Sequence, residues 1–169
     1  MIGDWGCIDP YRGDHENAIR HYRDAMTVDP HSQVPYWGLG KTLLLQGKYG
    51  ETTKVMRQFK PTNGFEPPLL TAEIGYALGK EGKTGESERG IVDLQGESKL
   101  MFVDPYLVSP INLGMGDEHL TLQWLNRAHV VRSPFLISIA TEPKWKQMIE
   151  RPGLKEFLAK MIPLENPQN

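Results

Sequence analysis

The sequence predicts an all-α fold in which helical hairpins stack on one another. A motif recurs at a fixed interval, since Gly13 and Gly47 lie 34 residues apart, as do Tyr22 and Met56, and a period of this length is typical of helical repeats. Within each period, apolar and small residues recur every three or four positions, which is the spacing of one face of an α-helix. One such hairpin cannot cover its own apolar face, so it must pack against its neighbours.

The clearest hairpin surrounds Gly47. Leu39, Gly40 and Leu43 fall on one face of its first helix, and Gly40 removes a side chain where a second helix must approach closely. Gly47 is expected to end this helix and to supply the turn. The first helix therefore has both a packing face and a stop signal.

The second helix of this hairpin is indicated by Thr52, Met56 and Phe59, which recur at four and three residues and would form its packed face. Upstream, Asp29 and Pro30 are expected to end one hairpin and lead into the next. Downstream, the pattern returns after about one more period, with Gly82 in the role of the turn glycine.

The later hairpins are expected to be irregular. Pro110 stands where the first helix of the fourth hairpin should continue, and a proline inside a helix costs about 3 kcal/mol or forces a kink. Gly90 and Gly96 weaken the long helix expected between residues 86 and 101. We expect four hairpins, the third and fourth irregular, followed by two or three short helices and no strand.

This pattern resembles the tetratricopeptide repeat (TPR), whose consensus has Trp-Leu-Gly-Tyr on the first helix and Ala-Phe-Ala-Pro on the second. The matching positions are Tyr36, Leu39, Gly40 and Leu43 in the first set, and Ala18, Tyr22, Ala25 and Pro30 in the second. The resemblance implies a right-handed solenoid of about four hairpins. The order of motifs from Phe102 to Leu158 is similar to the last repeats and C-terminal cap of arrays in bacterial multidomain regulators, and the whole resemblance covers roughly residues 13–162.

The chain is expected to divide into four parts. These are an irregular or truncated N-terminal segment (1–12), a TPR-like repeat array (13–132), a C-terminal helical cap (133–162) and a tail (163–169). The helix that should precede Gly13 would contain Gly3, Gly6 and Pro10, which are poor helix formers. An incomplete end leaves apolar side chains in need of cover, so we expect fusion to another domain or a homo-oligomer through this end.

The composition excludes several functions. Apolar residues make up 39% of the 169 and charged residues 24%, which is ordinary for a globular protein. The 19 basic and 21 acidic side chains nearly balance, which argues against direct binding of nucleic acid. No apolar run approaches the roughly 18 residues that span a bilayer. We therefore expect a cytoplasmic protein that does not contact a membrane.

No catalytic or metal-binding motif stands out. Cys7 is the only cysteine, which excludes an intrachain disulfide and any multi-cysteine metal site. The histidines form no helical metal pair, and no serine lies in a Gly-x-Ser-x-Gly elbow. We assign no catalytic residue, no metal and no cofactor.

The run from Ala77 to Thr84 satisfies a relaxed phosphate-loop pattern with alanine in place of the first glycine. A phosphate loop follows a buried strand, because the loop amides and the next helix must converge on phosphate. Here the run leaves a helix, and the repeat register already explains Gly82. Nucleotide binding stays an alternative, as does a small-molecule enzyme with an unrecognised site.

The resemblance also implies where a partner would bind, because the first helix of each TPR hairpin lines a concave groove. The positions expected to be exposed there are Val34, Trp37, Lys41, Leu44, Leu45, Leu69, Ala72, Tyr76, Lys80, Tyr106 and Leu113. Among them, Val34, Trp37, Lys41, Leu44, Tyr76, Lys80 and Tyr106 are the candidate partner-binding residues. Such an aromatic and aliphatic groove with two cations suits a protein or peptide. The expected function is therefore a non-catalytic interaction scaffold or regulatory module.

Overall fold

The computed structural model describes residues 14–161, and every regular element within them is a helix. The elements are α1 (His15–Val28), α2 (Gln33–Leu45), α3 (Tyr49–Met56), α4 (Phe59–Asn63), α5 (Pro68–Lys80), α6 (Thr84–Glu97), the 3₁₀ helix η2 (Pro105–Val108), α7 (Ser109–Met115), α8 (Glu118–Val130), the 3₁₀ helices η3 (Pro134–Ala140) and η4 (Pro143–Trp145), α9 (Lys146–Ile149) and α10 (Pro152–Met161). The expected all-α class is confirmed for this part of the chain. The expected segments 1–12 and 163–169, and with them Cys7, lie outside the described residues.

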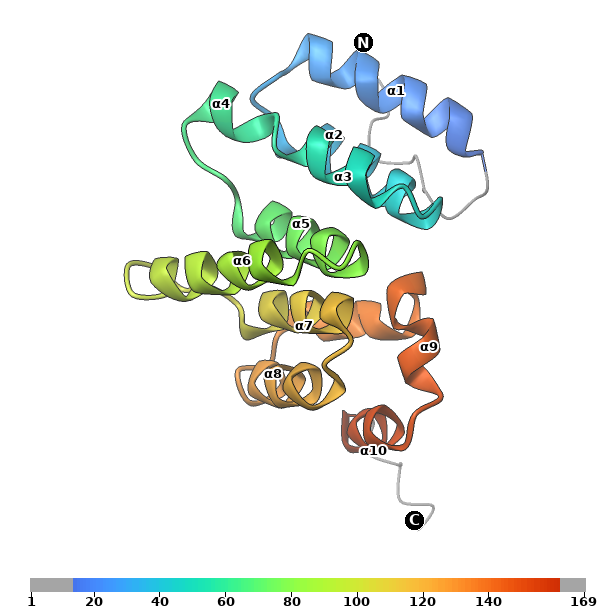
Figure 1. Cartoon of the computed structure of the whole chain (residues 1–169), viewed down its shortest axis with the longest axis vertical. Helices are drawn as coiled ribbons and strands as arrows, with labels where there is room; N and C mark the ends of the chain where they lie inside the picture. Colours follow the sequence, from blue (N-terminus) through green and yellow to red (C-terminus); the bar gives the residue numbers. More distant parts are fainter. Residues whose placement is uncertain (1–13, 162–169) are drawn as a thin grey trace, which may run out of the picture.

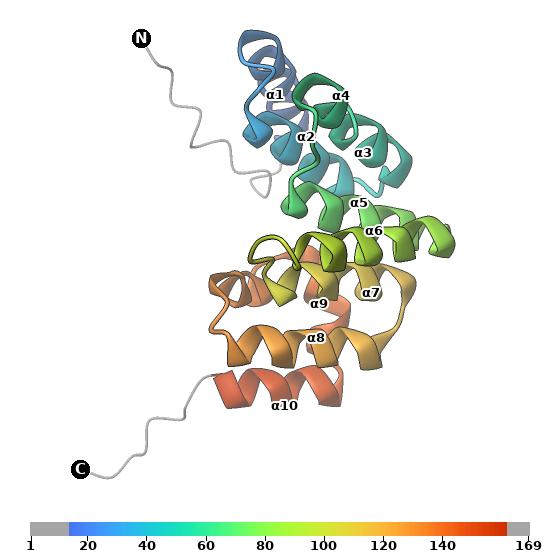
Figure 2. The same ribbon diagram turned by 90° about the vertical axis from the view of Figure 1, so that its left-hand side faces the viewer.

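The helices lie in a row from α1 at one end to α10 at the other (Figures 1 and 2). Helices that follow one another in the chain pack side by side, α1 on α2, α2 on α3, α5 on α6 and α7 on α8. Helix α5 lies at the centre, where it also contacts α3 and α7. No helix between residues 14 and 161 has the length and apolar character needed to cross a membrane.

In the described part of the chain, glycines follow the first helix of the second hairpin (α2 with α3), the third (α5 with α6) and the fourth (α7 with α8), as the sequence predicts for Gly47 and Gly82. Gly47, Gly82 and Gly116 have φ angles of 71°, 76° and 81°, a left-handed conformation that other residues adopt only at a cost. The next helix then begins within two residues, and Asp117 caps α8 by accepting a hydrogen bond from the backbone nitrogen of Leu120 at 2.8 Å. These turns reverse the chain tightly enough for the paired helices to touch.

Two further glycines allow α5 and α7 to meet backbone to backbone. A Cβ atom on Gly114 would lie 2.4 Å from the carbonyl oxygen of Tyr76, and one on Gly79 would lie 2.6 Å from the carbonyl carbon of Gly114. The role expected of Gly40 is also confirmed, because a Cβ there would lie 2.1 Å from the end of the Met56 side chain. Close packing at α5 and α7 fixes the middle of the row.

The third hairpin is more regular than expected. Helix α6 is continuous over 14 residues despite containing both Gly90 and Gly96, and Gly90 faces Ile111 and Thr71 at close range. Packing against α5 and α7 therefore outweighs the low helix propensity of glycine.

The fourth hairpin is irregular as expected. Pro110 falls in the first turn of α7, directly after η2, where a missing N–H is tolerated.

The second hairpin contains a break that the spacing did not predict. Thr52 and Met56 lie on α3, but Phe59 begins the separate helix α4. Pro61 explains the difference, because it cannot donate the hydrogen bond that a continuous helix would require of it. Phe59 is nevertheless buried, and its ring meets that of Tyr36 edge to face with 5.3 Å between centroids.

The C-terminal helices share one hydrophobic core with the fourth hairpin. Trp145, Met148, Leu154 and Phe157 belong to the same cluster as Ile111 of α7. Trp145 is fully buried in this cluster. Trp124 of α8 is half-buried against it, and the guanidinium of Arg127 lies 4.4 Å from the centre of its ring. The cap is therefore part of the fold and not an appendage.

Candidate functional site

The chain after α8 crosses the face formed by α2, α5 and η2. Ser133 begins this segment as the N-cap of η3, because it accepts a hydrogen bond from the Phe135 backbone nitrogen at 3.3 Å, and Pro134 follows at the first helical position. The preceding residue, Arg132, has a φ of 57°, which turns the chain away from α8. We define residues 133–149, which include η3, η4 and α9, as the crossing segment.

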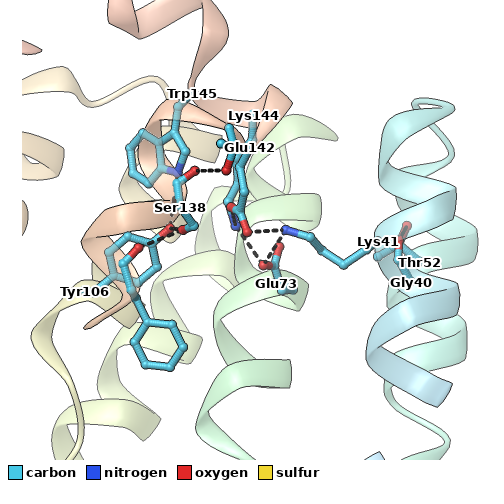
Figure 3. Close-up of polar contacts among 11 residues, drawn as sticks. Gly40, Lys41, Thr52, Glu73, Tyr106, Ser138, Glu142, Lys144 and Trp145 are labelled. Carbon is cyan, nitrogen blue, oxygen red and sulfur yellow. Dashed lines mark hydrogen bonds and ion pairs between the residues drawn. The ribbon is translucent and has the colours of Figure 1, made fainter. Parts of the chain in front are cut away.

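Two charges of the crossing segment meet two charges of the hairpins (Figure 3). Lys41 of α2 places its Nζ 2.9 Å from Oε1 of Glu142 and 3.3 Å from Oε1 of Glu73 on α5. Lys144 places its Nζ 2.7 Å from Oε1 of Glu73 and 3.1 Å from Oε2 of Glu142. The side chains are between 4% and 13% exposed. We call Lys41, Glu73, Glu142 and Lys144 the four-charge cluster.

The ion pairs of the cluster keep Glu73 and Lys144 in their charged forms. Burial alone would raise the pKa of Glu73, but the positive charges and hydrogen bonds of Lys144 and Lys41 outweigh it and lower that pKa to about 2. Burial would likewise lower the pKa of Lys144, yet Glu73, Tyr106 and Glu142 raise it well above its usual value. A carboxylate with such a low pKa is a weak proton acceptor. The cluster is therefore better suited to holding the crossing segment in place than to transferring protons.

This shift makes stability depend on pH. The pKa of Glu73 is about 2 in the folded protein against 4.5 ordinarily, so its stabilising effect is complete above about pH 4.5 and is lost as the pH falls toward 2. Urea unfolding at pH 7, 5, 4 and 3 is expected to show a steeper acid loss for the wild type than for Glu73→Gln, which cannot titrate there. Parallel losses in the two proteins would contradict this origin.

Trp145 anchors the crossing segment beside the cluster. Its side chain is fully buried, and its Nε1 donates a hydrogen bond to the hydroxyl of Tyr106 at 3.2 Å. Ser138 lies 3.2 Å from the same hydroxyl, and the ring of Phe135 stacks on that of Tyr106 with 5.5 Å between centroids. The crossing segment therefore covers Tyr106 on several sides (Figure 3).

The crossing segment changes the groove expected from the sequence. Four positions expected to be exposed are buried, and for these the expectation is wrong: Lys41, Ala72, Tyr76 and Tyr106. Lys41 and Tyr106 are covered because they contact the crossing segment directly. The other expected positions keep some exposure, fully for Val34 and Lys80 and partly for Trp37, Leu44, Leu45, Leu69 and Leu113.

An open pocket of about 480 Å³ remains next to the cluster. Its walls combine hairpin residues with residues of the C-terminal segment, in particular Lys41, Leu44, Leu45, Tyr49, Tyr76, Lys80, Leu113, Glu118, Glu142, Lys144, Lys146, Gln147 and Arg151. Four of the seven candidate residues are thus brought together: Lys41, Leu44, Tyr76 and Lys80. Val34, Trp37 and Tyr106 do not line it, although the Nζ of Lys41 lies 5.6 Å from the centre of the Trp37 ring.

Several residues of the site were not predicted from the sequence. Glu73 had a usable signal, because it is the only charged residue between Pro68 and Gly79 in an otherwise apolar helix, and such a charge needs a buried partner. Glu142 and Lys144 had none, since they meet Lys41 and Glu73 only through a long-range contact. Lys146 lines the pocket only because the C-terminal helices fold back on the hairpins, which local sequence patterns do not indicate.

The phosphate-loop-like run lies in a turn between two helices. Ala77 is within α5, Gly82 forms the turn and Thr84 begins α6, so a helix precedes the run where a phosphate loop requires a strand. Lys83 lies 3.1 Å from Glu81 in an ion pair. Among residues 14–161, no three His, Cys, Asp or Glu side chains are grouped so that they could hold a metal ion.

The candidate site is therefore the four-charge cluster together with the pocket beside it. Its residues come from α2, α3, α5, α7, the start of α8, the crossing segment and Arg151, which come together only in the folded chain. The chain matches no protein-family model, no curated protein and no solved structure.

Proposed function

We propose that this chain is a non-catalytic protein-interaction module that holds a peptide or protein partner in the pocket beside the four-charge cluster. The observation that supports this most is that the face of α2, α5 and η2 already holds the short helices of the crossing segment through side-chain contacts. Trp145 serves as a buried aromatic anchor, and next to it Glu142 pairs with Lys41 and Lys144 with Glu73. Peptide-binding surfaces use the same combination of anchor and charge.

The TPR-like architecture is part of this proposal. The turn glycines Gly47, Gly82 and Gly116 follow one another at intervals of 35 and 34 residues, which is the spacing of that repeat class. A right-handed solenoid of this kind would offer the first helices of its hairpins to a partner. The crossing segment fills the middle of that surface, which leaves the pocket as the part that a partner could occupy.

The charged groups of the pocket favour binding over catalysis. Glu142 is bridged by two lysines, and Glu118 lies 2.8 Å from Arg151 in an ion pair. A general base needs a free carboxylate with access to its substrate, and both of these carboxylates are already engaged by cations. No feature of the pocket singles out another reacting group.

Selection of peptides from a random display library against the whole chain tests the proposal. Selected peptides are expected to bind at least about tenfold more weakly to Leu45→Glu, which places a charge in the apolar wall of the pocket. Val92→Glu is the matched control, because Val92 is exposed on α6 and does not line the pocket. Failure to enrich any peptide, or equal binding to both variants, would refute the proposal.

The nucleotide alternative is tested in the same preparation. Saturable binding of ATP that is lost in Lys83→Ala would favour it over peptide binding.

A further inference from the structure

We propose that the pocket recognises an acidic peptide, with a ligand carboxylate held by Lys80 and Lys146 and an aliphatic side chain of the ligand against Leu44 and Leu45. This inference rests on the proposed function and adds the chemistry of the partner. It follows from three features of the pocket, namely its unpaired charge, a hydroxyl without a hydrogen-bond partner and an apolar wall.

The first feature is the charge that remains after the ion pairs are formed. The cations lining the pocket are Lys41, Lys80, Lys144, Lys146 and Arg151, and the anions are Glu118 and Glu142. Lys41 and Lys144 are neutralised by Glu73 and Glu142, and Arg151 by Glu118. Within the described part of the chain, Lys80 and Lys146 have no ion-pair partner, so the pocket carries two free positive charges in a protein whose net charge is −2.

The second feature is the hydroxyl of Tyr76. This side chain is only 8% exposed and lines the pocket, yet its hydroxyl makes no hydrogen bond to any residue between 14 and 161. Burial and the neighbouring Tyr49 raise the pKa of Tyr76 to about 12, so the hydroxyl keeps its proton at neutral pH. It is therefore available as a donor to an acceptor such as a carboxylate oxygen.

The third feature is the apolar wall. The aliphatic and thioether side chains on the lining are Leu44, Leu45, Leu113, Met115 and Met148. A strongly hydrated small anion would gain nothing from this wall, whereas a peptide can bring an aliphatic side chain next to its carboxylate. The volume of about 480 Å³ suits roughly two or three side chains of an extended peptide.

The probe is a capped Leu-Glu-Glu-Leu tetrapeptide, titrated into the full chain to roughly 10 mM so that millimolar dissociation constants are detected. Binding is followed by backbone amide NMR, and Leu-Gln-Gln-Leu is the uncharged control. The glutamate peptide is expected to bind at least about tenfold more tightly than the glutamine peptide, and more weakly as salt is added.

Charge reversal locates the contact. The double variant Lys80→Glu, Lys146→Glu is expected to lose at least about tenfold in affinity for the glutamate peptide. The matched variant Lys60→Glu, Lys99→Glu changes the net charge equally at exposed lysines outside the pocket and is expected to leave the affinity within about twofold. Tyr76→Phe, which removes only the hydroxyl, is expected to weaken binding severalfold.

The outcomes separate this inference from the function on which it rests. Equal binding of the two tetrapeptides, or equal losses in the two double variants, would overturn the inference. The same holds if neither tetrapeptide binds while display-selected peptides bind in a Leu45-dependent way, and in that case the interaction module itself would stand. If no tetrapeptide and no display-selected peptide binds at the pocket, both the inference and the proposed interaction module would be wrong.

Discussion

Replacing Glu73 by leucine is expected to lower the free energy of unfolding by about 3–5 kcal/mol at pH 7. Oε1 of Glu73 lies within 3.3 Å of the ammonium groups of both Lys41 and Lys144. Without it, two buried lysines share the single carboxylate of Glu142, and the uncompensated charge is left on side chains that are only about 5–6% exposed. Urea unfolding followed by far-UV circular dichroism measures the change.

A surface ion pair provides the control for Glu73→Leu. Glu86 lies 3.3 Å from Arg57, and both side chains are more than 40% exposed, so Glu86→Leu is expected to cost no more than about 1 kcal/mol. Adding Lys144→Met to Glu73→Leu removes one charge of each sign and should recover part of the loss. A loss below about 1 kcal/mol for Glu73→Leu would mean that the cluster is solvated.

Trp145→Ala is expected to cost a similar amount, about 3–5 kcal/mol. The indole is fully buried in the hydrophobic core shared by α7, α8 and α10. Its ring centroid lies 6.0 Å from that of Tyr106. Truncation leaves a cavity between the crossing segment and the hairpins, and it removes the hydrogen bond to the Tyr106 hydroxyl. The change is measured by the same urea experiment.

Trp145→Phe separates the two contributions. The smaller ring keeps an aromatic contact with Tyr106, while the donor is lost, so about 1–2 kcal/mol is expected. Tyr106 still has Ser138 as a partner, which limits the loss. If Trp145→Ala unfolded at the same urea concentration as the wild type, the crossing segment would not be bound as described.

Local patterns in the sequence predicted the helices and turns well. The turn positions of Gly47 and Gly82 and the close approach at Gly40 follow from conformations and spaces that only glycine fits, and these signals depend on neighbouring residues alone. The apolar spacing also placed Leu39 and Leu43 correctly in the core. Pro61 was overlooked, although it carries the local signal for the break after α3.

The candidate site depended on information that local patterns do not contain. Lys41 and Tyr106 were expected on an open surface, but both are covered by a segment that lies far along the chain. Lys41 and Glu142 are 101 residues apart, and neither has a neighbour in sequence that indicates the other. The repeat register could identify the face of each helix but not the segment that packs on it.

The four-charge cluster has a consequence for how this chain could evolve. Repeat proteins commonly lengthen by duplicating a hairpin, because each unit contacts only its neighbours. A hairpin inserted between α4 and α5 would move Lys41 away from Glu142 by roughly the 8–10 Å that separates packed helices, and Lys41 would lose both of its carboxylate partners, Glu73 and Glu142. The number of hairpins between α2 and the crossing segment is therefore constrained. Duplication is tolerated only at positions that leave the contacts of Lys41 with Glu73 and Glu142 intact.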